Sequence, residues 1–121
     1  MNLIGDKITY KPDEQFHLND VSFNFKKGNL YTILGRTLSG KTTLLKTIAG
    51  LLNPDQGSIF FEEKDFIKIP VWERNVAMVY QQFINYPHLN VYENITFPLV
   101  QRKLSPQQIK NDVDEALETV G

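Results

Sequence analysis

Residues 35–42 carry a motif for binding phosphate groups, and this motif leaves few folds open to the chain. They read Gly-Arg-Thr-Leu-Ser-Gly-Lys-Thr, which fits the pattern G-x-x-x-x-G-K-[ST] and directly follows the apolar run 30–34. In such a loop the backbone N–H groups surround the phosphates, the lysine reaches the β and γ oxygens, and the last hydroxyl ligates Mg²⁺. The chain is therefore predicted to bind ATP or GTP.

Composition narrows the function classes. The net charge is −1, and the 13 Lys and Arg residues are scattered along the chain, so we expect no nucleic-acid partner. With no cysteine, disulfides and thiolate metal sites are excluded. No apolar stretch approaches about 20 residues, and the first seven residues do not resemble a signal peptide. We expect one domain in the cytoplasm.

Hydrophobic patterning predicts a mixed α/β chain. Two runs, 30–34 and 76–80, are almost continuously apolar, which is typical of strands covered on both faces of a parallel sheet. A helix should follow the motif, because leucines and isoleucines in this stretch share one face. The expected strands are 3–10, 18–25, 30–34, 58–61 and 76–80, and the expected first helix is 40–52. Trp72 is expected to pack beneath the loop before the last of these strands.

Two further helices are indicated by their capping residues. Asn90 with Glu93 forms a capping box for a helix that Pro98 should end. Ser105 is a helix cap followed by proline at the first helical position, and this helix should extend to Gly121.

The sequence resembles the nucleotide-binding subunit of ABC transporters. Besides the phosphate loop, Gln81 stands at the end of the second apolar run, and residues 71–95 are similar almost throughout to the Q-loop region of ATPases that drive bacterial sugar or polyol import. The resemblance covers essentially all of the chain, and it is more specific than the phosphate loop, which many NTPase families share.

The resemblance implies a fold and its extent. The fold would be an α/β P-loop NTPase with a RecA-like parallel sheet and an amino-terminal antiparallel β-layer. Residues 1–121 would form the amino-terminal part of an ATPase domain, with a helical subdomain that starts at about residue 105 and is truncated before it is complete. The Walker B acids and the signature motif would lie beyond residue 121, so the chain is predicted to be inactive alone. Glu62 and Glu63 follow an apolar run, but turn signals around them favour a hairpin.

The resemblance also implies site residues. Gln81 would be the Q-loop glutamine, a catalytic residue that positions water and, with Thr42, ligates Mg²⁺. Tyr10 is the candidate for stacking on adenine, and Phe16 is the alternative. The residues expected to contact ATP are Gly35, Thr37, Leu38, Ser39, Gly40, Lys41, Thr42, Thr43 and Tyr10.

The phosphate loop departs from the family pattern at two positions. Arg36 and Leu38 stand where the family commonly has proline and glycine. If the backbone at position 38 requires a positive φ, the leucine side chain would narrow the phosphate cradle.

Partners follow from the same resemblance. Phe83–Leu89 would receive a coupling helix of a membrane-spanning subunit, and a second ATPase subunit would complete a dimer. The chain would then be peripheral on the inner face of the cell membrane. The transported solute, a sugar or polyol by resemblance, is selected by other subunits. Two alternatives stand beside this interpretation: a non-catalytic nucleotide-binding fragment, and a P-loop nucleotide kinase or GTPase, for which we find neither an acceptor site nor a guanine-reading motif.

Overall fold

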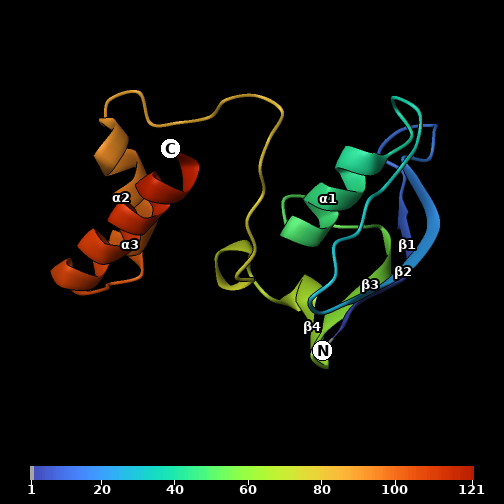
Figure 1. Ribbon diagram of the computed structural model, residues 1–121. Coiled ribbons are helices and arrows are strands. Elements are labelled where there is room, and N and C mark those ends of the chain that lie inside the picture. Colours follow the sequence, from blue (N-terminus) through green and yellow to red (C-terminus); the bar gives the residue numbers. More distant parts are fainter. Residues whose placement is uncertain (1) are drawn as a thin grey trace. The chain divides into compact units, whose positions relative to one another are not determined.

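The computed structural model describes residues 2–121. The chain divides into two compact units, one ending at Val79 and one beginning at Tyr80, and each is described by itself. The first unit holds the phosphate loop and the second holds two helices (Figure 1). In chain order the elements are β1 (Asn2–Tyr10), β2 (Leu18–Lys26), α1 (Lys41–Ala49), β3 (Gln56–Phe61), β4 (Lys64–Asp65), the 3-10 helices η1 (Phe66–Lys68) and η2 (Val71–Glu73), α2 (Val91–Gln101) and α3 (Pro106–Val120).

Strands β1 to β4 form one antiparallel sheet in the order β2-β1-β3-β4. β1 is central, so that Leu3 pairs with Phe25 of β2 on one side and with Phe61 of β3 on the other. This confirms the predicted amino-terminal antiparallel layer and the strands expected at 3–10, 18–25 and 58–61.

Helix α1 covers one face of this sheet (Figure 1). The buried core joins the helix to the strands and to η1, through Ile8, Leu18, Leu44, Ile59 and Phe66. The helix ends earlier than residue 52, because Gly50 adopts φ +90° and its N–H bonds back to the carbonyl of Thr47 at 3.2 Å.

The two apolar runs expected to be parallel strands are not strands. Residues 30–34 and 76–80 have no regular secondary structure, and Leu30, Leu34 and Val79 are almost fully exposed. A β-strand is defined by hydrogen bonds to a neighbour, and the sheet found within residues 2–121 is the antiparallel one. The apolar pattern therefore identified segments suited to a buried sheet, but it could not show which strands would pair with them.

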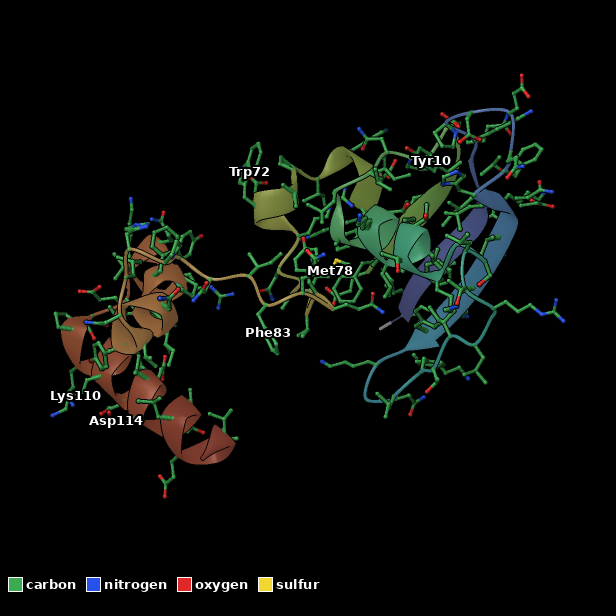
Figure 2. All side chains as sticks on the ribbon, turned by 90° about the horizontal axis from the view of Figure 1, so that it is seen from above. Tyr10, Trp72, Met78, Phe83, Lys110 and Asp114 are labelled. Carbon is green, nitrogen blue, oxygen red and sulfur yellow. The ribbon has the colours of Figure 1, made fainter. Side chains whose placement is uncertain are left out.

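The turn after β3 is a hairpin, as the sequence favoured. Glu62 and Glu63 both have positive φ, 51° and 65°, and they connect β3 to the antiparallel β4. Two consecutive positive φ values are typical of a two-residue hairpin turn. The prediction for Trp72 was wrong: its side chain is 81 % exposed on η2 and projects away from the ribbon (Figure 2).

Both predicted helix caps are present in the second unit. Asn90 Oδ1 accepts from the N–H of Glu93 at 2.8 Å, and the Glu93 carboxylate accepts from the N–H of Asn90 at 3.0 Å. Ser105 Oγ accepts from the N–H of Gln108 at 3.2 Å, which starts α3. The local chemistry of these side chains was enough to locate both helix starts.

Helix α2 does not end at Pro98, contrary to expectation. The proline lies inside the helix, and its carbonyl accepts from the N–H of Arg102 at 3.1 Å. The fixed φ of proline is compatible with a helix, and what a proline removes is one N–H donor. In this short helix that loss does not stop the last turn from forming.

Candidate nucleotide-binding site

The phosphate loop joins the apolar run 30–34 to the amino end of α1. The N–H of Ser39 donates to the carbonyl of Arg36 at 3.1 Å and so tightens the loop. Gly40 has φ +95°, and a Cβ there would collide with the carbonyl oxygen of His17. Position 40 therefore requires glycine both for its positive φ and for the close approach of the His17 carbonyl. This close approach packs the loop against the segment that joins β1 to β2.

Lys41 directs its ammonium into the loop. Its Nζ donates to the carbonyls of Gly35 at 2.6 Å and Arg36 at 2.7 Å, and it lies 3.4 Å from Ser39 Oγ. The positive charge thus stands at the amino end of α1, where unpaired N–H groups also favour an anion. The arrangement suits a polyphosphate, with the exposed Thr42 next in the helix to supply a hydroxyl for Mg²⁺.

Leu38 does adopt the positive φ considered from the sequence. Its φ is +66°, yet its side chain is 100 % exposed to solvent. The leucine therefore strains the backbone without filling the loop.

The two candidates for the adenine platform lie at the end of β1 and within the segment that joins β1 to β2. Tyr10 is half-buried, packs against the core, and meets the ring of His17 edge-on with centroids 5.8 Å apart. Phe16 is 52 % exposed, and Lys11 Nζ lies 4.8 Å from its ring centroid. Contact between His17 and Gly40 brings this segment to the phosphate loop. Both rings therefore belong to the surroundings of the loop, and Phe16 offers the freer face.

Arg74 is a residue that sequence reasoning missed. Its guanidinium is buried beneath the carboxyl end of α1, where Nη1 lies 3.3 Å from the carbonyls of both Thr47 and Ile48. Burial lowers the pKa of Arg74, and the nearby Asp65 carboxylate acts in the opposite direction. The only sequence signal was its place within the stretch 71–95 that carries the family resemblance.

Gln81 and the segment Phe83–Leu89 belong to the second unit. Gln81 and Phe83 are exposed, and Figure 2 shows the Phe83 ring projecting from the trace. Asn94, which was also missed, shapes the segment: its amide nitrogen donates to the carbonyls of Tyr86 and Leu89 at 3.2 and 3.1 Å. The approach of Gln81 to the phosphate loop stays a prediction.

Comparison with known proteins decides the family. The model of the family described as ABC transporter matches residues 18–121, which include the phosphate loop and Gln81. The chain belongs to this family.

Relatives of the ABC transporter chain are named for import. The spermidine/putrescine import ATP-binding protein of Fusobacterium nucleatum is 38 % identical over 104 residues, covering 86 % of this chain and 28 % of that protein. The protein of the same name from Mycoplasma capricolum is 39 % identical over 114 residues, covering 94 % of this chain and 32 % of the relative. This chain therefore spans about a third of the length of these relatives.

A solved structure supports the same fold. A dimeric ATP-binding cassette in a post-hydrolysis state, bound to ADP and Pi, superposes with a TM-score of 0.80 at 26 % identity, over 96 % of this chain and 56 % of that one. The α/β P-loop class predicted from the sequence is thus confirmed, and the nucleotide kinase and GTPase alternatives are set aside. Within residues 2–121 of this ABC transporter chain, no helix is both long and apolar enough to cross a membrane.

Proposed function

We propose that this chain is the ATP-binding portion of an ABC import ATPase. The observation that carries the proposal is the Lys41 ammonium held inside the phosphate loop at the amino end of α1. Together with family membership and the import ATP-binding relatives, this geometry supports Mg-ATP as the ligand. The residues proposed to hold ATP are Gly35, Thr37, Leu38, Ser39, Gly40, Lys41, Thr42, Thr43 and Tyr10.

Each residue of the site has a role in this proposal. Loop N–H groups and Lys41 would neutralise the phosphates, and Thr42 would supply a hydroxyl to Mg²⁺. Gln81 would be the Mg²⁺ ligand and water-positioning residue that the resemblance implies. Mg²⁺, when bound, would supply further neutralisation of the phosphate charge. Among residues 2–121 no cluster of three or more His, Asp or Glu side chains gathers. Adenine is proposed to stack on Tyr10, with Phe16 as the alternative.

The proposed partners lie outside the chain. Phe83–Leu89 would dock on a membrane-spanning subunit, because Phe83 and Ile84 expose apolar side chains and Asn94 holds the following residues in place. A second ATPase subunit would complete the nucleotide site, as the dimeric solved relative suggests. We therefore place the chain at the inner face of the cell membrane, as the amino-terminal part of an ATPase domain within residues 1–121.

The class of solute that the transporter imports is the most specific part of the proposal. Residues 71–95 favour a sugar or polyol importer by resemblance, whereas the relatives reported above are named for spermidine and putrescine. The assembled transporter distinguishes them, since its ATPase rate should rise with the matching solute-loaded binding protein. Stimulation by spermidine and not by a polyol would assign the polyamine class.

Titration with Mg-ATP tests the nucleotide site. Lys41→Ala is expected to abolish binding or weaken it severely, because the charge-assisted bonds of this ammonium to the phosphates are lost. Lys46→Ala is the matched control, since Lys46 lies on the same helix in its last turn. Calorimetry should show binding by the parent and by Lys46→Ala. Equal affinities for the parent and Lys41→Ala would refute the loop assignment.

A further inference from the structure

Helix α1 is anchored at both ends by groups far apart in the sequence. Its amino end carries the phosphate loop and Lys41, and its carboxyl end rests on Arg74. The helix has nine residues, so its two ends are about 13 Å apart by the rise of an α-helix. Because α1 is short and internally hydrogen-bonded, a change in the position of its carboxyl end also tilts its amino end.

The guanidinium of Arg74 joins two stretches of backbone. Besides the carbonyls of Thr47 and Ile48, it reaches the carbonyl of Ile69 through Nε at 2.9 Å and that of Ile67 through Nη2 at 3.4 Å. The first two belong to the end of α1, and the last two belong to the η1 segment. One rigid, planar fork thus links the helix to the segment that follows the sheet.

The side chain of Arg74 is buried and closely packed by its neighbours. The side chain is only 6 % exposed, and its Cζ lies 5.1 Å from the ring centroid of Phe66, a core residue. On the other side, a Cβ added at Gly50 would stand 2.8 Å from Cζ. Burying a cation is costly unless it is satisfied, and here backbone carbonyls and the negative end of the α1 dipole satisfy it.

We propose that Arg74 is a positioning residue for the phosphate loop: by fixing the carboxyl end of α1, it sets the orientation in which Lys41 and the loop meet the phosphates. This inference rests on the proposed nucleotide-binding function. A lysine at position 74 keeps the charge but loses the fork, because a single ammonium does not span carbonyls on two segments. Gly50→Ala disturbs the same contact from the other side, both through its Cβ and through its φ of +90°.

The test compares binding of Mg-ATP and of Mg-tripolyphosphate by the parent, Arg74→Lys and Gly50→Ala. Each variant should weaken both ligands by about tenfold, or about 1.4 kcal/mol, because the loss acts on phosphate contacts shared by the two. The double variant should be little worse than either single one, since both remove one contact. Ile59→Val, a conservative change in the same core, supplies a control whose thermal midpoint falls while every group that contacts the Arg74 guanidinium is kept.

Each outcome decides the proposal. Unchanged affinities in both variants, a loss confined to Mg-ATP, or an equal loss in Ile59→Val at a matched thermal midpoint would overturn the positioning role. A parent chain that binds neither ligand would overturn the proposed function and this inference together. If Arg74→Lys does not fold, Gly50→Ala decides alone, because it leaves the arginine in place.

Discussion

Leu38 and Gly40 stand two residues apart in the phosphate loop, and both have left-handed backbones, with φ of +66° and +95°. For the glycine this conformation carries no steric cost, whereas a residue with a Cβ loses about 1–2 kcal/mol in it. The exposed leucine side chain gains no packing in return. The loop therefore holds strain at position 38, and strain of this kind concentrates at functional sites.

Leu38→Gly is expected to raise the free energy of unfolding by about 0.5–1 kcal/mol, the relief of strain being partly offset by the greater entropy of the unfolded chain. Leu38→Ala is the matched control, because it removes the apolar side chain but keeps the Cβ. Urea denaturation of the three chains measures the difference. A stabilisation of equal size in the alanine variant would show that side-chain exposure, and not backbone strain, is responsible.

The structure sharpens the choice between two aromatic platforms for adenine. Tyr10→Ala should weaken Mg-ATP by about 1–3 kcal/mol if its ring stacks on the base, and GTP should suffer similarly, because stacking reads a π-face. Phe16→Ala is the paired variant, since its ring is the more exposed. Fluorescence titration of both variants measures the loss. A weakening seen only in Phe16→Ala would transfer the role to that ring.

Local chemistry was readable from the sequence, and long-range pairing was not. The caps at Asn90 and Ser105 act within three residues, and Gly40 belongs to a fixed motif, so each was predicted where the structure has it. The runs 30–34 and 76–80 were misassigned because strand formation depends on a neighbour that hydropathy does not identify. Arg74 was missed because it bonds to Thr47, 27 residues away.

Phe83–Leu89 is expected to be the docking surface for a membrane subunit. Phe83 and Ile84 expose large apolar side chains on a segment held by Asn94, and contiguous apolar exposure marks interaction sites. Cysteine at position 83 should cross-link to cytoplasmic loops of the transporter in membranes. The chain has no cysteine of its own, so a single replacement gives an unambiguous product.

Lys110→Cys is the control for this cross-linking, because Lys110 is exposed on α3 of the same unit (Figure 2). It should give no product with the membrane subunits. Equal yields from both positions would show random collision, and cross-linking of Phe83→Cys only to a second copy of itself would count against docking.

The chain alone is expected to hydrolyse no ATP, even though its phosphate loop is intact. By the resemblance described above, hydrolysis would require Walker B carboxylates to hold Mg²⁺ and the attacking water, and a signature motif from the opposite subunit to close the site. Glu62 and Glu63, an acidic pair that follows the apolar end of β3, occupy a hairpin turn between β3 and β4. A carboxylate in that turn belongs to the antiparallel layer.

Phosphate release by the purified chain should therefore equal the buffer background, and Gln81→Ala should leave it there, because positioning a water has no effect without a base to activate it. Lys41→Ala separates true turnover from contamination, since a contaminating ATPase is insensitive to that change. If the parent releases phosphate steadily and Lys41→Ala does not, residues 1–121 contain a catalytic carboxylate. Glu62→Gln and Glu63→Gln would then identify which carboxylate it is.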